Sequence, residues 1–469
     1  MLDTAMSWSR VSDYIASAMG LHFPGERLQD LKRGLSGAAA EFGFDDAAAC
    51  ADWMLTAPLS PADLHVLAGH LTIGETYFFR DEKLFDALAG TVLPALLRAR
   101  EGKEQRLRLW SAGCCTGEEA YSLAILLHQL IPDLARWHVS ILATDINIRF
   151  LRKAAAGAYG EWSFRNAPAG FKERWFQRTA DGQYLLVPEV KRLVTFAPSN
   201  LVEDAFPALA TDTNAMDLIL CRNVLMYFTP AQASKVVGKL HRALVGDGWL
   251  AVSPSEASRE LFPQFAIRNF PGVILFNKAV TAGGRLAFDT PAPWMPPPPS
   301  VEPAALELPT AEPTLDTTAS TPALAPPAPA PSDSQAPRAL LLEARALANE
   351  GRLTEALAAC DRWIAADKID AAGHYLRALV LLELGDADAA NGSLQRTLYL
   401  NPNLVAAHFT LGNLARGRGL DAQADRHFRN ALHLLARHRS DDPVPESDGL
   451  TAGRFGEIIR ELIAVEQPS

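Results

Sequence analysis

The stretch that decides the fold runs from Arg106 to Glu119 and reads RLRLWSAGCCTGEE. It begins with an apolar strand that ends at Trp110, continues through a turn with two glycines, and leads into a helix from Ala120 to about Leu130. Glycine adopts backbone conformations that other residues avoid, so the main chain of such a turn can approach a ligand closely. This order of elements is typical of the first unit of an α/β domain.

Five more apolar stretches continue the alternation of strands and helices, at 137–144, 193–200, 216–221, 248–253 and 272–278. Alternation of this kind predicts a largely parallel sheet covered by helices. In a parallel sheet the ligand lies beyond the carboxyl ends of the strands. We therefore expect the functional residues directly after each strand.

The residues after the first two strands indicate the kind of ligand. The turn has the pattern Gly113-xxx-Gly117 and is followed by Glu118 and Glu119, whereas a turn that cradles a pyrophosphate has GxGxxG. Two carboxylates suit a cationic group, such as an ammonium, although one acid is also explained by the positive helix N-terminus. Asp145 ends the second strand, where it can accept the hydroxyls of a ribose or cap the next helix. Together these residues predict a nucleoside joined to an amino acid, a description that S-adenosylmethionine fits.

Three further motifs lie near the expected ligand. Asn200 and Leu201 follow the third strand, and CRNVLMYF at 221–228 follows the fourth. TIGETYFFRD at 72–81 precedes the first strand, and its Phe-Phe-Arg is also consistent with a core pair beside a surface arginine.

Taken in order, the motifs TxxxTYFFRD, LWSAGCCTGEEAYSLA, ATDI, SNL and CRNVLMYF resemble the chemotaxis receptor methyltransferases (CheR) over about residues 8–280. The resemblance implies transfer of a methyl group from S-adenosyl-L-methionine to glutamate side chains of methyl-accepting chemoreceptors. The products would be glutamate methyl esters and S-adenosyl-L-homocysteine. It also implies a helical N-terminal subdomain, a Rossmann-like methyltransferase domain and a small antiparallel insertion, for which Asp181-Gly182 is a hairpin signal.

The resemblance assigns roles where the motifs match. Arg80 and Tyr227 would lie at the methyl-transfer site, with Arg80 also touching the cofactor. Glu118, with Glu119 as its rival, would hold the methionine amino group, and Asp145 the ribose. The remaining implied cofactor contacts are Thr76, Asn200, Leu201, Arg222 and Asn223.

Two positions depart from the family pattern: Gly74 replaces a polar cofactor contact, and Ser253-Pro254-Ser255-Glu256 replaces a turn that contains histidine.

The implied methyl transfer requires few catalytic groups. A glutamate carboxylate, with a pKa of about 4.3, is charged at neutral pH and needs no general base. We expect no metal, because no metal-ligand spacing occurs among the histidines.

The C-terminal part repeats with a period of 34 residues, in the glycines Gly351, Gly385 and Gly419 and the alanines Ala356, Ala390 and Ala424. A glycine that ends one helix, followed by an alanine that lets the next helix approach closely, resembles tetratricopeptide repeats. Repeats of this kind bind proteins, so we expect a second, unidentified protein partner. The sequence leaves open whether the repeats fold back over the catalytic part.

Composition sets the domain boundaries. The stretch 286–337 has no Lys or Arg and contains fifteen of the 32 prolines between Pro291 and Pro337, which predicts a disordered linker. We expect a helical subdomain at 1–90, the methyltransferase domain at 91–282, the linker at 283–336, three repeats at 337–436, and a capping helix with a tail at 437–469.

Charge and cysteine content restrict the partners. A net charge of -10 argues against nucleic acid as a partner, and five cysteines without a CxxC pair suit a cytoplasmic protein. No stretch is apolar enough for membrane insertion. Arg27, Lys32 and Arg33 either form a basic docking surface for the acidic receptor or an ordinary solvated helix face. A catalytically weak repeat scaffold in a chemosensory-type pathway is the alternative function.

Overall fold

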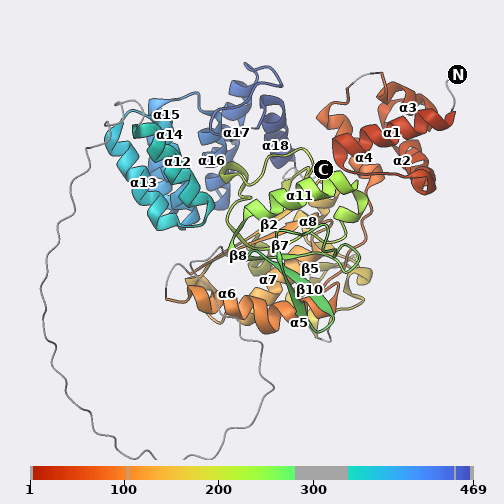
Figure 1. Ribbon diagram of the computed structural model, residues 1–469, viewed down its shortest axis with the longest axis horizontal. Coiled ribbons are helices and arrows are strands. Elements are labelled where there is room, and N and C mark those ends of the chain that lie inside the picture. Colours follow the sequence, from red (N-terminus) through yellow and green to blue (C-terminus); the bar gives the residue numbers. More distant parts are fainter. Residues whose placement is uncertain are drawn as a thin grey trace, which may run out of the picture.

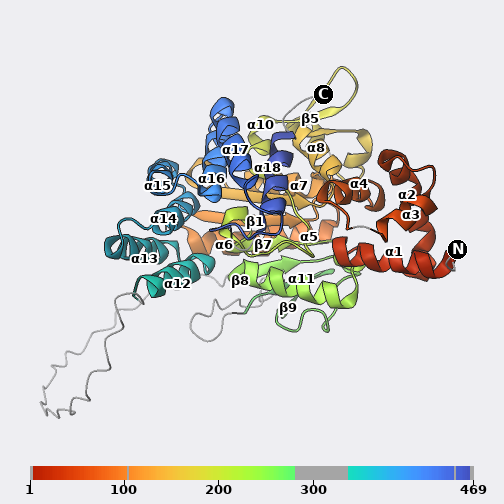
Figure 2. The same cartoon turned by 90° about the horizontal axis from the view of Figure 1, so that it is seen from above.

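The computed structural model describes residues 4–279 and 336–464, except for residues 57, 103–104, 169 and 448–449. A sheet domain lies between two groups of helices, one from the N-terminal part of the chain and one from the C-terminal part (Figures 1 and 2). The predicted linker, apart from residue 336, lies outside the described residues.

A seven-stranded sheet forms the centre, in the order β6-β2-β1-β7-β8-β10-β9. β1 pairs in parallel with both of its neighbours, so that Leu109 lies opposite Ile141 of β2 and Leu218 of β7. β10 runs antiparallel to β8 and β9. This order confirms the predicted Rossmann-like methyltransferase fold, although β9 was not predicted. The strands are β1 (Arg106–Ala112), β2 (His138–Asp145), β6 (Val194–Pro198), β7 (Met216–Leu220), β8 (Leu244–Ala251), β9 (Ala266–Phe270) and β10 (Val273–Asn277).

Both faces of the sheet are covered, which explains why β1 is buried along its whole length. Leu109 packs into the core on one face and Trp110 into the core on the other, as the two-residue period of a strand requires. The first face carries α5 (Glu82–Ala87), α6 (Leu93–Arg100) and α7 (Glu118–Leu130), and the second carries α11 (Pro230–Ala243).

A small antiparallel sheet, in the order β3-β5-β4, stands beside the main one, as predicted. Gly182 has a φ of 83° in the turn that joins β4 to β5, in agreement with the hairpin signal. The elements of this region are α8 (Ile148–Ala156), β3 (Ala158–Tyr159), α9 (Phe171–Trp175), β4 (Phe176–Arg178), β5 (Tyr184–Leu186) and α10 (Pro188–Lys191).

The N-terminal helices form a cluster with its own core, which includes Val11, Leu31 and Leu67. Ser60 caps the last helix: its hydroxyl accepts a hydrogen bond from the Asp63 N–H, and the Asp63 carboxylate accepts one from the Ser60 N–H. The helices are α1 (Thr4–Met19), α2 (Leu28–Phe42), α3 (Ala47–Met54) and α4 (Pro61–Leu71).

The C-terminal helices form three hairpins and a final helix. Gly351, Gly385 and Gly419 have φ values of 75°, 82° and 70° in the turn inside each hairpin, where a side chain would be strained. The alanines of the repeat are buried in the second helix of each pair. The pairs are α12 (Ala336–Asn349) with α13 (Leu353–Ala366), α14 (Ala371–Glu383) with α15 (Ala387–Leu400), and α16 (Val405–Gly417) with α17 (Asp421–Leu435).

The last helix, α18 (Ala452–Ala464), packs Phe455 and Ile459 into the core of the repeats, consistent with a capping helix. In the part of the chain that the structure describes, no helix combines the length and apolar character that crossing a membrane requires.

Candidate functional site

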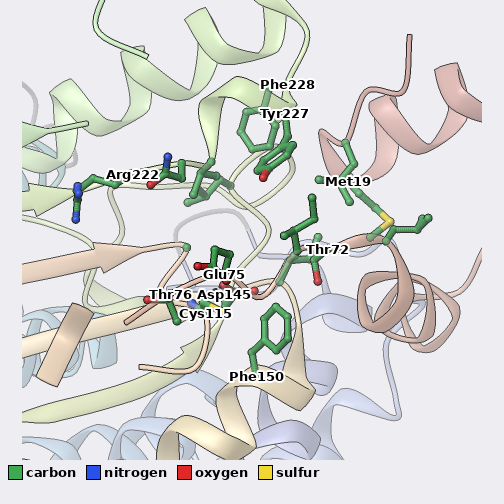
Figure 3. Close-up of a pocket in the computed structure, with 18 of the residues that line it drawn as sticks. Met19, Thr72, Glu75, Thr76, Cys115, Asp145, Phe150, Arg222, Tyr227 and Phe228 are labelled. Carbon is green, nitrogen blue, oxygen red and sulfur yellow. Dashed lines mark hydrogen bonds between the residues drawn. The ribbon is translucent and has the colours of Figure 1, made fainter. Parts of the chain in front are cut away.

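A cavity lies between the carboxyl ends of the parallel strands and the N-terminal helices, and its space amounts to about 990 Å³ with the open mouth included. Figure 3 shows Tyr227 and Phe228 on one side of it and Thr72 and Phe150 on the other. Of the predicted site residues, the cavity brings together Thr76, Arg80, Asp145, Asn200, Leu201, Arg222, Asn223 and Tyr227.

The glycine turn after β1 forms part of the cavity floor. Gly113 has a φ of 85°, and a Cβ atom there would lie 2.3 Å from Cγ2 of Val224. No other residue fits, because the turn after β1 and the loop after β7 touch at this point. The turn continues to Cys115, whose burial raises the pKa of its thiol to about 12, so the thiol stays protonated at neutral pH.

Asp145 lies at the end of β2, as predicted. Its two carboxylate oxygens accept hydrogen bonds from the N–H groups of Cys115, at 2.9 Å, and Asn147, at 2.8 Å. Burial raises the pKa of Asp145 to about 6, against these backbone donors, which lower it. The side chain is thus a buried carboxylate on the cavity wall, and each of its oxygens accepts a hydrogen bond from a backbone group.

The two glutamates that begin α7 point in different directions. The Glu118 carboxylate accepts hydrogen bonds from the hydroxyls of Thr116, at 2.6 Å, and Ser163, at 2.9 Å, and does not line the cavity. Glu119 does line it. Glu119, named above as the rival of Glu118, thus lies on the cavity wall, because the packing of α7 turns its first residue toward Ser163.

The loop after β7 contains two polar residues, Arg222 and Asn223, which differ in their surroundings. The Arg222 guanidinium is buried between the carboxylates of Glu119, at 3.1 Å, and Asp81, at 3.3 Å. Asn223 has a φ of 58°, an uncommon conformation for a residue with a side chain. Arg222 therefore neutralises the acids beside the cavity.

Glu256 fixes the conformation of this loop. In the sequence this residue is noted only as part of a departure from the family pattern. Its buried carboxylate accepts hydrogen bonds from the N–H groups of Asn223, Val224, Met226 and Ser253, at 2.7–3.2 Å. An isolated Ser-Pro-Ser-Glu gives no sequence signal for such a role, because three of the four donors lie about thirty residues earlier in the chain.

Replacing Glu256 with glutamine should lower the melting temperature. The amide cannot accept all these hydrogen bonds, and buried donors without a partner cost about 2 kcal/mol, which corresponds to roughly 4–8 °C for a domain of this size. Calorimetry of the full chain measures the shift. Glu260→Gln, at an exposed position nearby, is the matched control, and equal melting temperatures for the two variants would contradict the role of Glu256.

Arg80 and Tyr227 approach the cavity from opposite parts of the chain. The Arg80 guanidinium donates a hydrogen bond to the Glu75 carbonyl and lies 5.9 Å from the centre of the Tyr77 ring. Arg80 forms no ion pair with a carboxylate of the described residues. Tyr227 carries the Arg27 guanidinium over its ring, at 5.3 Å.

The end of α1 and the connection from α1 to α2 complete the cavity, and the sequence did not predict this contribution. The lining includes Met19, Leu21, His22, Phe23 and Arg27. Two hydrogen bonds hold this segment against the sheet domain: the His22 N–H donates to the Tyr227 carbonyl, and the Asn200 side-chain amide donates to the Ala18 carbonyl. No pattern marks such residues, because only packing brings them to the strand ends.

The basic residues of the N-terminal region have different surroundings, although Arg27 and Arg33 both lie beside the Asp30 carboxylate. Arg27 lines the cavity, Lys32 lies over the Trp8 ring, and Arg33 projects into solvent beside Asp30. Arg33 is the most exposed of the three, and a docking surface for the receptor stays a prediction.

Gly74 makes room for a cavity residue. A Cβ atom at this position would lie 2.8 Å from the end of the Phe150 ring, which lines the cavity. An aromatic side chain from α8 thus occupies the space that a polar side chain at position 74 would need.

The residues fit a ligand with an adenosine part and an amino acid part. Asp145 offers a carboxylate to hydroxyl groups, Glu119 offers one to an ammonium, and the rings of Phe150 and Phe228 provide apolar walls. The adenosyl-amino acid predicted from the sequence uses all of these groups.

Comparison with known proteins agrees with this geometry. Residues 74–270 match the model of the CheR methyltransferase SAM-binding domain. A probable biofilm formation methyltransferase, WspC, of Pseudomonas aeruginosa is 32% identical over 383 residues, which are 78% of this chain and 85% of that protein. The WspC of Pseudomonas putida is 30% identical over 81% of this chain and 89% of its own length.

Another relative matches a shorter part of this chain. Chemotaxis protein methyltransferase 2 of Vibrio cholerae is 33% identical over 211 residues, which are 45% of this chain and 72% of that protein. Most residues that line the cavity lie within residues 74–270, and the chain belongs to the CheR family of S-adenosylmethionine-dependent methyltransferases.

Proposed function

We propose that the protein methylates glutamate side chains in the cytoplasmic domain of methyl-accepting chemoreceptors. The observation that carries this proposal is that Arg80, Asp145 and Tyr227, from three distant parts of the sequence, line one cavity in a CheR-family domain. When bound, S-adenosylmethionine supplies an electrophilic methyl group.

The protein's own residues bind, align and exclude water. Asp145 accepts the ribose hydroxyls, and Glu119, in place of Glu118, accepts the amino group. Thr76, Asn200, Leu201 and Asn223 contact the rest of the cofactor, while Arg222 acts indirectly by orienting the Glu119 carboxylate through its ion pair.

Arg80 and Tyr227 position the incoming carboxylate. A glutamate carboxylate is charged at neutral pH, so alignment and exclusion of water are what the site must provide. Arg80 is suited to this task because its guanidinium has no carboxylate partner among the described residues and can pair with that of the receptor. The apolar walls beside it limit access of water.

We further propose that the receptor belongs to a pathway that controls biofilm formation. The two WspC proteins match this chain over 383 and 399 residues, well beyond the catalytic part, and both carry that description. A receptor of this kind and a receptor of flagellar chemotaxis share the same acceptor chemistry.

Methyl transfer to receptor-containing membranes tests the proposal. Labelled S-adenosylmethionine should give a product that releases methanol in base, as a glutamate methyl ester does, with membranes from cells that hold a biofilm-type or a chemotaxis receptor. Release that disappears with Arg80→Ala is the expected result. Binding of S-adenosylhomocysteine without any release from either membrane would contradict glutamate methylation.

Cofactor binding should weaken in acid. The Asp145 carboxylate is charged above its raised pKa of about 6 and becomes protonated below it. The protonated form accepts weaker hydrogen bonds from the ribose hydroxyls. If only the charged form binds, the affinity for S-adenosylhomocysteine falls about tenfold between pH 7 and pH 5. Calorimetric titration at both pH values measures it. Asp145→Asn, which cannot titrate, should lack this dependence, and an equal slope in both proteins would assign it to another group.

A further inference from the structure

The repeats are packed on the catalytic domain through a buried charged cluster. Glu383, at the end of α14, accepts a hydrogen bond from Arg106 Nη1 at 2.8 Å and forms a second ion pair with Arg108. The three side chains are only 4–6% exposed. A buried carboxylate between two arginines is stable only while both partners stay in place. The contact therefore depends on docked repeats.

The turns inside the first two repeats add to this contact. A Cβ atom at Gly351 would lie 3.2 Å from Val245 Cγ1, and one at Gly385 would lie 3.2 Å from His138 Nδ1. Gly419, the equivalent residue of the third repeat, has no atom within 4 Å of that position. Two of the three repeating glycines thus lie directly against the sheet domain.

A segment of the catalytic domain lies against the repeats in return. Leu209, in the connection between β6 and β7, is 7% exposed and belongs to the hydrophobic core of the repeats. Together with Asp212 it faces the first helices of the second and third repeats across a cavity. We call this surface of the repeats the first-helix face; it consists of Leu379, Leu382, Glu383, Thr410, Asn413 and Leu414.

The same connection begins at the cofactor cavity. Asn200 lines that cavity, its N–H donates to the Asp204 carboxylate at 2.8 Å, and the Asp204 N–H donates to the Asn200 carbonyl at 2.8 Å. Lys239 donates to the carbonyls of Leu201 and Asp204, at 2.8 and 2.9 Å. The first part of the path from the cofactor cavity to Leu209, residues 200–204, is therefore held by hydrogen bonds.

We propose that residues 203–213 are an intramolecular ligand of the repeats, and that docking of the first-helix face supports the adjacent wall of the cofactor cavity. Repeat solenoids commonly bind a segment of another protein on such a surface. Here the chain supplies its own segment, so another protein reaches this face only by displacing residues 203–213. By linkage, whatever releases the repeats also weakens cofactor binding, and the cofactor strengthens docking.

Hydrogen exchange of the full chain tests the docking. Glu383→Lys puts a third positive charge beside Arg106 and Arg108 and should release the repeats. Amides of 203–213 and of the first-helix face should then lose protection, while α13, α15 and α17 keep it, which distinguishes release from unfolding. Glu355→Lys makes the same change at an exposed site on α13 and is the matched control.

A second variant and a second measurement complete the test. Leu209→Asp removes the apolar contact and leaves the charged cluster, and it should also cause loss of protection on the first-helix face. In both variants the affinity for S-adenosylhomocysteine, measured by calorimetry, should fall about fivefold or more. Unchanged protection in both variants overturns the docking. Lost protection with unchanged affinity overturns the link to the cofactor cavity.

Discussion

Replacing Arg80 with alanine is expected to lower the rate of methyl transfer about 100-fold, the usual loss when one positioned donor is removed from a reaction site. The guanidinium is held at the cavity by the Glu75 carbonyl and has no carboxylate partner among the described residues. It is therefore free to receive the carboxylate of the receptor. The rate is measured at saturating S-adenosylmethionine with receptor-containing membranes.

The fold should survive this change, because Arg80 is only half-buried and donates its hydrogen bond to a backbone carbonyl at the cavity edge. Arg98→Ala, at an exposed position of α6 away from the cavity, is the matched control and should keep the full rate. An Arg80→Ala protein with normal rate and normal cofactor affinity would remove Arg80 from the mechanism.

Replacing Asp145 with alanine should have its main effect on binding. Two hydrogen bonds from hydroxyls to a charged acceptor contribute about 3 kcal/mol in total, so the dissociation constant of S-adenosylhomocysteine should rise about 100-fold. Calorimetric titration at pH 7.5 measures it. At this pH the wild-type carboxylate, with its pKa of about 6, is charged.

The control for Asp145 must separate binding from folding, because the Cys115 and Asn147 N–H groups also lose their acceptor. Asp145→Asn keeps the size of the side chain and one acceptor oxygen, and should weaken binding less. Asp133→Ala changes an exposed aspartate after α7 and should leave the affinity unchanged. If Asp145→Ala binds as tightly as Asp133→Ala, the ribose lies elsewhere.

The sequence predicted the sheet well because most of its strands are marked by a short, continuous stretch of apolar residues. Each apolar stretch is bounded by turn residues, and six of the seven strands of the large sheet coincide with the expected stretches. β9 (Ala266–Phe270) was not predicted. It lies at the edge of the sheet and only partly buries its side chains, so its sequence AIRNF contains no continuous apolar run.

The site was predictable where a residue follows a strand, and less so where packing sets the direction of a side chain. Glu118 and Glu119 are neighbours on α7, so the sequence places both near the strand end, but only the rotation of the helix decides which one faces the cavity. The same limit applies to Glu256 and to the segment around His22, whose partners are distant in sequence.

The buried cluster of Arg106, Arg108 and Glu383 also has a consequence for synthesis of the chain. Residues 1–279 leave the ribosome first and include both arginines and Leu209, whereas the repeats are complete only at residue 464, which is 464 − 279 = 185 residues later. At about 5–20 residues per second, this delay lasts roughly 10–40 s. During that time Arg106, Arg108 and Leu209 of the new chain are exposed to water. The completed repeats of a neighbouring chain on the same messenger can then contact this surface, which the new chain's own repeats cover later.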